Sequence, residues 1–240
     1  MKKLLFFALC LALFTACTSS KLARQNPAAP GFNTAESDAK AVAIANQVMH
    51  AMGGRKAWDE TCGIAWTFLN RRKLTWDKAA GVCQIQWLNR PLTISVDLHA
   101  GTGNVLFDGV AQTHPDTLVK YLDMGKKAWI NDSYWLVMPF KLKDSGVTLK
   151  YFGKGKTDAG ENADILQMTF SDVGVTPENK YHVWVDTKSH LVTQWAYFPK
   201  FSDEKPALQN PWGDYVRYGE ILLSGTRGKM GGMLPMRVLE

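Results

Sequence analysis

Short stretches in which apolar and polar residues alternate recur along most of this chain, and this alternation restricts its fold more than any other feature. The clearest stretch spans residues 92–99 and reads LTISVDLH, so that every second residue is apolar. A period of two predicts a β-strand with one face in the core and the other in water. About eleven segments fit this pattern, at residues 63–71, 72–77, 82–87, 92–99, 105–109, 133–138, 147–152, 164–170, 181–186, 190–198 and 214–222, with a further candidate at 234–239.

Two other segments carry helical spacing. Apolar residues recur at steps of three and four over residues 36–52, and Gly53 follows as a stop signal. A second helix is predicted over residues 115–122, with a proline at its start. Strands and helices do not alternate in a βαβ rhythm, and the tight turn in VDTKSHL at 185–191 predicts an antiparallel hairpin. The pattern favours an α+β, mainly β fold: one large, curved antiparallel sheet with helices packed on one side.

The stretch Ser133–Phe140, SYWLVMPF, departs from simple alternation because both of its faces are apolar. Interpreted as a strand, it places Tyr134 and Leu136 on one side and Trp135 and Val137 on the other. A strand covered on both sides lies in a closed core or beside a pocket that holds an apolar molecule. The sequence alone leaves these two alternatives open.

The first residues are typical of an export signal and not of a folded domain. Lys2 and Lys3 precede an apolar stretch, Leu4–Phe14, which is too short to span a bilayer. The signal closes with TAC, and this ending resembles the lipobox of bacterial lipoproteins. The resemblance implies cleavage before Cys17 and lipidation of that residue, for example with palmitate. Thr18, and not Asp, follows the cysteine, as in enterobacterial lipoproteins addressed to the outer membrane. The alternative is a plain secretory signal with an incidental cysteine.

The chain is accordingly divided into a signal peptide (residues 1–16), a lipidated cysteine with a flexible Ser-, Ala-, Pro- and Gly-containing tether (residues 17–33), and one domain (residues 34–240). Within that domain, Cys62 and Cys83 would reside in an oxidising compartment. They flank the first predicted strands, so a disulfide between them is sterically allowed. Two reduced thiols that act as small apolar groups are the alternative.

Several strings resemble a branch of uncharacterised bacterial envelope lipoproteins assigned to the LolA/LolB-like superfamily. They are AMGGRKAWDE, RRKLTWDKAAG, PDTLVKYLDMGKKAWINDSYWLVMPFKLKDSG, NKYHVWVD and PWGDYVRYGEILLSG, which together span most of residues 50–225. The resemblance implies an unclosed half β-barrel of about eleven strands, helices covering its concave side, and an apolar interior that holds acyl chains. A lipid-anchored chain resembles LolB in its placement, since LolA has no anchor, but no position here matches the protruding leucine loop of LolB.

Large apolar residues of the predicted strands would line the interior of such a half-barrel. The candidates for this apolar cavity are Trp66, Phe68, Ile94, Val96, Leu98, Trp135, Leu166, Met168 and Trp195. The same side chains can instead fill a solid core, because a curved sheet needs bulky residues on its concave side.

The sequence shows no motif for catalysis or metal binding. No G-x-S-x-G string occurs, and the five histidines lack a paired metal spacing such as H-E-x-x-H. Basic residues are scattered, apart from NRRK at residues 70–73, so they form no stripe for nucleic acid. This cluster is interpreted as a solvated hairpin edge or as a contact for an anionic partner.

We therefore predict a non-enzymatic lipoprotein of the bacterial envelope, without catalytic residues, cofactor, metal or nucleic-acid partner. It would be attached to the outer membrane through Cys17, with its domain facing the periplasm or the surface, and would bind lipid or an acylated protein. The alternative is a structural or interaction lipoprotein with a solid core, which contacts another envelope protein through its edge strands or through the hairpin at Arg71–Lys73.

Overall fold

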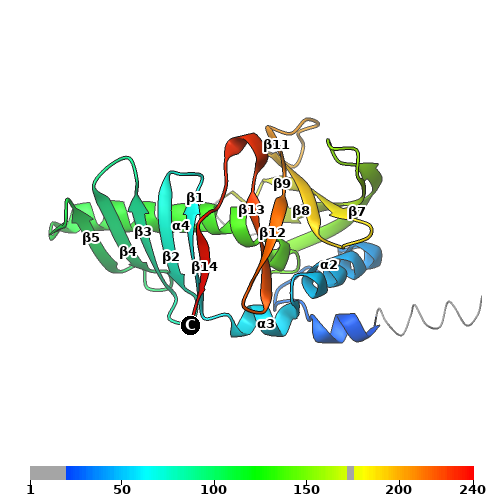
Figure 1. Ribbon diagram of the computed structural model, residues 1–240, viewed down its shortest axis with the longest axis horizontal. Coiled ribbons are helices and arrows are strands. Elements are labelled where there is room, and N and C mark those ends of the chain that lie inside the picture. The colour runs from blue at the N-terminus through cyan, green and yellow to red at the C-terminus, as the bar shows by residue number, and fades with distance from the viewer. Residues whose placement is uncertain (1–19, 172–175) are drawn as a thin grey trace, which may run out of the picture.

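The computed structural model describes residues 20–171 and 176–240, which form a mainly β structure with helices (Figure 1). The helices are α2 (Ala39–Ala51), α3 (Gly54–Glu60) and α4 (Pro115–Val137), with 3-10 turns η1 (Met138–Lys141) and η2 (Gly228–Met230). Residues 20–25 are also helical. The strands are β1 (Gly63–Phe68), β2 (Arg72–Asp77), β3 (Val82–Trp87), β4 (Leu92–Asp97), β5 (Gly103–Phe107), β6 (Val110–Ala111), β7 (Val147–Lys156), β8 (Asn162–Phe170), β9 (Lys180–Asp186), β10 (Val192–Phe198), β11 (Leu208–Pro211), β12 (Gly213–Tyr218), β13 (Ile221–Thr226) and β14 (Met236–Leu239).

Hydrogen bonds divide these strands into three antiparallel sheets. The seven-stranded sheet has the order β14-β1-β2-β3-β4-β5-β6, the five-stranded sheet has the order β11-β10-β9-β8-β7, and β12 pairs with β13. In Figure 1 the two larger sheets occupy opposite halves of the molecule, with the β12–β13 hairpin between them. The open, antiparallel, mainly β architecture with helices is thus confirmed. The predicted single sheet of about eleven strands is replaced by three sheets with fourteen strands in the described residues. β6 and β11 are added, residues 214–222 turn at Gly219 to form two strands, and the further candidate at 234–239 is present as β14, whereas residues 133–138 form no strand.

Helix α4 is the longest helix and lies across one face of the seven-stranded sheet (Figure 1), where it contacts β3, β4 and β5. It begins with Pro115, whose fixed φ suits a first helical turn, and carries Asp116 near its positive end. Gly125 allows a close approach to the sheet, since a Cβ at this position would stand 2.7 Å from Cγ2 of Ile94. The prediction of a helix at residue 115 is confirmed, but the helix runs fifteen residues further than residue 122.

The prediction of a strand at Ser133–Phe140 is wrong, because these residues form the last turns of α4 and the turn η1. Most residues of this segment are buried, and Leu136, Val137 and Met138 are fully buried. An apolar run of this length cannot be distinguished from a buried helix by periodicity alone. Both faces are apolar because this end of α4 has packing partners on two sides.

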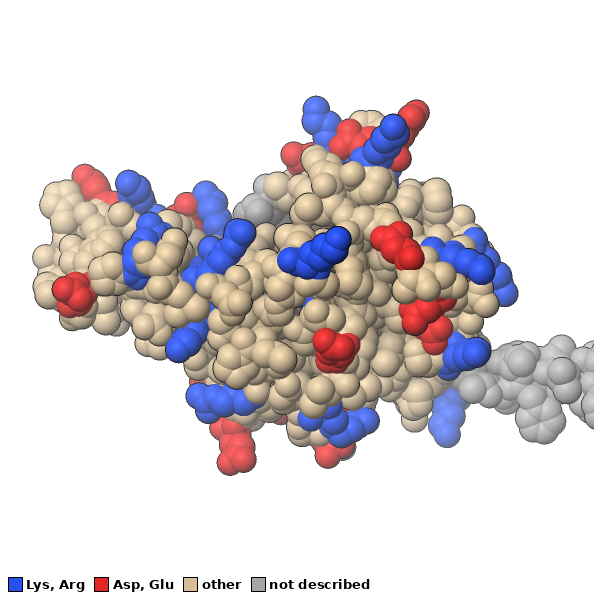
Figure 2. Space-filling model, turned by 45° about the horizontal axis from the view of Figure 1, so that its top comes forward, with Lys and Arg blue, Asp and Glu red and all other residues tan. Residues whose placement is uncertain are grey.

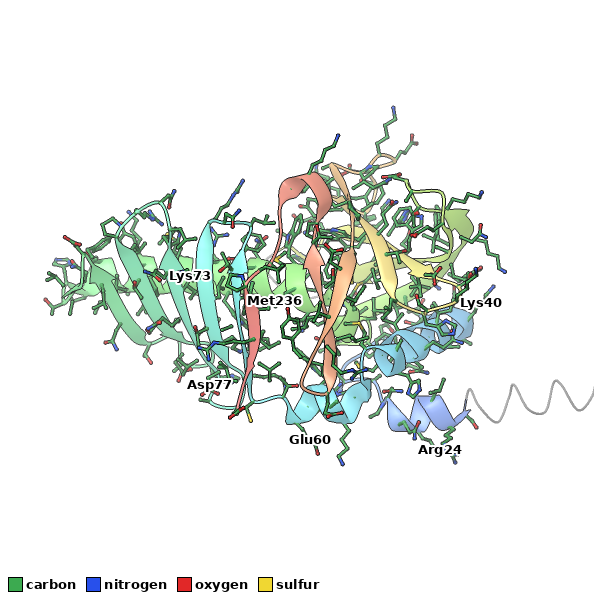
Figure 3. All side chains as sticks on the ribbon, viewed as in Figure 1. Arg24, Lys40, Glu60, Lys73, Asp77 and Met236 are labelled. Carbon is green, nitrogen blue, oxygen red and sulfur yellow. The ribbon has the colours of Figure 1, made fainter. Side chains whose placement is uncertain are left out.

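One continuous core joins both large sheets to the helices. Leu74, Ile85 and Ile94 of the seven-stranded sheet belong to the same buried cluster as Leu149 and Val183 of the five-stranded sheet. On β2, β3 and β4 of the seven-stranded sheet, the residues that alternate with the buried ones are exposed or half-buried. Lys73 and Asp77, labelled in Figure 3, belong to the more exposed set on β2. The molecule is therefore a single packed body in its described part.

The predicted flexible tether is shorter than residues 17–33, because residues 26–33 are attached to the body. Asn26 and Phe32 are buried, Ala29 donates its N–H to the carbonyl of Lys143 over 3.0 Å, and Asn33 donates to Val147 over 3.0 Å. The low hydrophobicity of this segment suggested a tether, but its main-chain groups complete the edge of β7. Arg24, labelled in Figure 3, marks the helical residues 20–25 that precede the attached part.

Charged residues are mixed on the surface. Figure 2 shows Lys and Arg side chains interspersed with Asp and Glu over the visible face. In residues 20–171 and 176–240, no helix combines the length and apolar character needed to cross a bilayer.

Candidate ligand pocket

The C-terminal part of α4 presents different faces to different neighbours. Residues four apart share a face of a helix, so Asp132 and Leu136 lie on one side. Asp132 reaches the seven-stranded sheet, where Arg72 of β2 donates to its two oxygens over 2.6 and 2.8 Å. Tyr134 and Trp135 lie on another side and contact aromatic residues of β9 and β10. The helix therefore forms a wall between the two sheets.

A pocket of about 320 Å³ lies between this wall and the five-stranded sheet. Its described lining comprises Ile130, Asn131, Tyr134, Trp135, Phe170, Thr176, Asn179, Tyr181, Trp195, Tyr197 and Leu208. Asn131, Thr176 and Leu208 are exposed, so they belong to the mouth, whereas Trp195 is buried and belongs to the deep wall. The volume lies at the lower end of the range of about 300–1,000 Å³ that is usual for small-molecule pockets.

Aromatic rings make up most of the deep wall. The rings of Tyr181 and Trp195 are stacked with centroids 5.1 Å apart, and Trp135 meets Trp195 edge-on at 4.7 Å. Tyr134 and Phe170 extend the cluster, at 5.5 Å each from Tyr181. Such ring pairs have defined relative orientations, so the wall is both apolar and fixed in shape.

The polar atoms of the pocket are mostly bonded to one another. Asn179 donates to Oγ1 of Thr176 over 2.6 Å and accepts from the Tyr197 hydroxyl over 3.5 Å. The Tyr134 hydroxyl donates to the sulfur of Met168 over 3.3 Å. Burial raises the pKa of Tyr134 well above its ordinary value and that of Tyr181 to about 12, although a hydrogen bond from the Asn179 side chain opposes the shift of Tyr181. Both phenols are therefore neutral at physiological pH.

A buried cation holds the end of α4 behind this pocket. Arg227, which follows β13, donates Nε to the carbonyl of Trp135 over 3.1 Å and Nη1 to Oγ of Ser224 over 2.8 Å. Its guanidinium lies 3.5 Å from the ring centroid of Trp212, and burial lowers its pKa to about 9. These contacts fix the main chain at Trp135 and hence the position of one wall of the pocket.

The structure separates the nine cavity candidates into three groups. Trp135 and Trp195 line the pocket. Phe68 and Met168 lie directly behind it, because the Phe68 ring is 6.2 Å from that of Trp135 and Met168 accepts the hydrogen bond of Tyr134. The remaining candidates are buried in the continuous core away from the lining: Trp66, Ile94, Val96, Leu98 and Leu166.

Sequence reasoning did not identify the polar and tyrosine residues of the pocket. Tyr181 lies on β9, Asn179 immediately precedes that strand, and Tyr197 lies on β10. Thr176 and Leu208 lie at the mouth. Alternation on β10 places Tyr197 on the same face as Trp195, which was the one available signal. The other residues are brought together by the topology of the five-stranded sheet.

The two cysteines of the domain are free thiols. Cys62 is exposed just before β1, whereas Cys83 lies on β3 and faces the core. Strand β2 lies between β1 and β3, so the two positions are about two strand spacings apart, or roughly 10 Å. A disulfide needs Cα atoms within about 7 Å, so the bridge considered from sequence does not form in this structure. Cys17, which the sequence predicts as the site of lipid attachment, lies outside the described residues.

The basic residues of the cluster at 70–73 differ in burial and in their partners. Arg72 is half-buried and engaged by Asp132, while Arg71 and Lys73 are exposed. Only the latter two are therefore available to an external partner. Among the described residues, no group of three or more His, Cys, Asp or Glu side chains is placed to hold a metal ion.

Comparison with known proteins finds similarity at the level of solved structures. No protein-family profile and no curated protein sequence matches the chain. A DUF1329 family protein from Desulfovibrio piger is 12% identical with a TM-score of 0.44, over 82% of this chain and 92% of that chain. A domain titled as an outer membrane lipoprotein-sorting protein, from Vibrio parahaemolyticus, is 11% identical with a TM-score of 0.38, over 84% and 94%. A LolA superfamily protein from Nitrosomonas europaea is 10% identical with a TM-score of 0.38, over 82% and 94%.

Proposed function

We propose that this protein is a membrane-anchored envelope lipoprotein that binds an apolar ligand, such as a lipid or an acylated protein, in the pocket between α4 and the five-stranded sheet. The observation that carries the proposal is the pocket itself, whose deep wall is aromatic and whose mouth is marked by Asn131, Thr176 and Leu208. Burial of apolar surface drives binding, at about 0.8 kcal/mol per methylene group. The role needs no proton transfer and no metal.

The size of the pocket restricts what enters it. At about 320 Å³ it suits a small apolar molecule or the end of one hydrocarbon chain. On the other side of α4, the helix packs directly on the seven-stranded sheet, and Gly125 brings it close to Ile94. The proposed ligand therefore inserts one end beside α4, and the rest of it extends past the mouth.

Binding can be measured on the full chain carrying Cys17→Ser, so that no acyl group of its own competes. We expect native mass spectrometry to show co-purifying apolar molecules, and 1-N-phenylnaphthylamine to increase its fluorescence on binding. Leu208→Arg places a charge at the mouth, where Leu208 is 37% exposed, and should weaken binding of the dye at least about tenfold. The unfolding midpoint should be unchanged because the position is not in the core.

The matched control is Val216→Arg on β12, where the native residue is 50% exposed and does not line the pocket. This variant should bind the dye as tightly as the parent chain. A bare mass together with no dye binding by the parent chain would exclude the ligand-binding role.

That result would favour the second candidate, a structural or interaction lipoprotein. The observation in its favour is the solid packing between α4 and the seven-stranded sheet, in which Ile94 and Val96 are fully buried. Arg71 and Lys73 would then contact the partner, because both are exposed beside the buried Arg72–Asp132 pair.

A further inference from the structure

Helix α4 ends with a main-chain acceptor that the sequence deprives of its usual donor. In an α-helix each carbonyl accepts from the N–H four residues later, so the carbonyl of Trp135 would be paired with residue 139. Residue 139 is a proline, which has no N–H. The helical ladder reaches Met138, whose N–H is bonded to the carbonyl of Tyr134. The Trp135 carbonyl therefore needs a donor from another part of the chain.

Arg227 supplies this donor from a position 92 residues further along the chain. Its Nε donates to the Trp135 carbonyl over 3.1 Å, and Nη2 donates to the same oxygen. Nη1 donates to Oγ of Ser224 over 2.8 Å and to the carbonyl of Thr226. All three nitrogen atoms of the guanidinium thus have acceptors, and this planar group joins the main chain at Trp135 to β13.

The burial of Arg227 is not explained by packing alone. The side chain is fully buried, and no carboxylate pairs with it in residues 20–171 and 176–240. A buried cation without a counter-ion is costly, whereas an apolar side chain of similar volume would pack without that cost. Carbonyl groups at the negative end of α4 offset part of it. The position therefore favours arginine because of the groups that the guanidinium holds.

The guanidinium also reaches the opposite wall of the pocket through Trp212. Its Cζ lies 3.5 Å from the ring centroid of Trp212, as in a cation–π contact. The Trp212 ring meets that of Trp195 nearly at a right angle, with centroids 6.0 Å apart. Trp135 and Trp195 both line the pocket and touch edge-on at 4.7 Å. These four residues form a closed circuit of contacts at the point where α4 meets the five-stranded sheet.

This circuit determines the width of the deep end of the pocket. The two walls meet at the contact between Trp135 and Trp195. Arg227 holds the main chain of the first residue and packs on the ring behind the second, so the walls cannot separate without breaking these contacts. A slender chain end can follow the narrowing space, whereas a broad rigid group enters it only if the walls move apart.

We infer that Arg227 is a positioning residue for ligand binding, which restricts the pocket to slender apolar groups by holding Trp135 and, through Trp212, Trp195. The inference rests on the proposed ligand-binding function and specifies the shape of the group that enters. Arg227 itself does not line the pocket, so it acts on the ligand only through these tryptophans.

Two uncharged alcohols with ten carbon atoms each test this role: decan-1-ol, which is a slender chain, and adamantan-1-ol, which is a compact cage. Both are used to displace 1-N-phenylnaphthylamine from the full Cys17→Ser chain, after the affinity of each variant for the dye has been measured. The quantity compared is the ratio of the decanol affinity to the adamantanol affinity, because comparison between variants cancels the different hydrophobicity of the two alcohols. In Arg227→Met, which removes every donor, this ratio should fall at least about fivefold.

Pro139→Ala provides a rescue, because it supplies an N–H four residues after Trp135. Added to Arg227→Met, it should recover at least about half of the lost ratio, and alone it should leave the ratio within about twofold of that of the parent chain. Ile85→Ala controls for lost stability, since Ile85 is fully buried on β3 and does not line the pocket. This variant should lower the urea midpoint without changing the ratio.

An unchanged ratio in Arg227→Met, or an equal loss of both alcohols, would show that the arginine only supports the fold. Either result would overturn the inference and leave the proposed function intact, and absence of any recovery in the double variant would refute the role of the Trp135 carbonyl. If Arg227→Met does not fold, Arg227→Lys replaces it, and its single ammonium group should lower the ratio at least about threefold; an unchanged ratio there is equally contrary. Failure of the dye and both alcohols to bind the parent chain would overturn the proposed function as well.

Discussion

At the scale of single residues, Lys143 is notable because its ammonium group lies in the interior. The residue is 6% exposed, and Nζ donates to the carbonyl of Asn26 and to Oδ1 of Asn46. No ion pair involves it among the described side chains, and burial lowers its pKa from 10.5 to about 8, with a smaller contribution from Arg55. A neutral amine still has two N–H groups for these two acceptors.

This shift predicts how stability depends on pH. Because the folded pKa lies below that of the unfolded chain, the unfolded chain binds more protons between about pH 8 and pH 10.5. The free energy of unfolding should therefore rise with pH in this window, by up to about 3 kcal/mol, and the penalty is fully present below pH 8. Urea unfolding at pH 7.5, 9 and 10 measures the slope.

The control for this titration is Lys143→Met, in which the same slope should be missing because the titrating group is gone. Parallel pH profiles for the two proteins would show that the buried ammonium is not responsible. The difference between the profiles, and not either profile alone, is the quantity that tests the shift.

At the scale of elements, the Arg72–Asp132 pair attaches α4 to β2. Asp132 is fully buried, and its burial raises the pKa of the carboxyl while the hydrogen bond and charge of Arg72 oppose that shift. Arg72→Met leaves a buried carboxylate without a countercharge and should cost about 3–5 kcal/mol of unfolding free energy. Arg72→Met combined with Asp132→Leu should recover most of that loss, since two apolar residues replace the pair.

A second ion pair on the same helix supplies the comparison. Lys127 and Asp123 are 2.8 Å apart but both are more than half exposed. Lys127→Met should therefore change the unfolding free energy by less than about 1 kcal/mol. Equal effects of the Arg72 and Lys127 substitutions in urea unfolding would contradict the role given to the buried pair.

Strands β2, β3 and β4 were predictable because one face of each is buried and the other is exposed or half-buried. The strands predicted at residues 72–77 and 82–87 coincide with β2 and β3. On β4, the alternation of apolar and polar residues matches the alternation of buried and half-buried residues, position by position. The strand prediction for Ser133–Phe140 failed for the opposite reason. This end of α4 lies between packing partners and is apolar on all sides. Local periodicity carries no information about a segment that has no wet face.

The pocket was predictable only in part for a related reason. Trp135 and Trp195 were identified as large apolar residues, but the same reasoning included Ile94 and Val96, which fill the core under α4. Whether such a residue lines a space or fills one depends on the distance between α4 and each sheet. That distance is set by tertiary contacts such as Gly125 against Ile94, which single-residue patterns do not encode.

At the scale of the whole molecule, the proposed attachment to the membrane depends on Cys17. Replacing it with serine should abolish incorporation of labelled palmitate and move the protein from the membrane fraction to the soluble fraction of a cell lysate. Cys62→Ser is the control, because Cys62 is an exposed free thiol of the folded body. That variant should keep both the label and the membrane association, whereas retention of label by Cys17→Ser would refute attachment at this residue.

The attachment of residues 26–33 to the body determines how far such an anchored protein can travel. Only nine residue steps separate Cys17 from buried Asn26, and residues 20–25 are helical. At about 1.5 Å per helical residue and 3.5 Å per extended one, this connection reaches roughly 20 Å, against roughly 55 Å for a free chain up to residue 33. A body held so close to the bilayer would sample molecules that emerge from that membrane, and an exchange with the opposite membrane of the envelope would require a separate diffusing carrier.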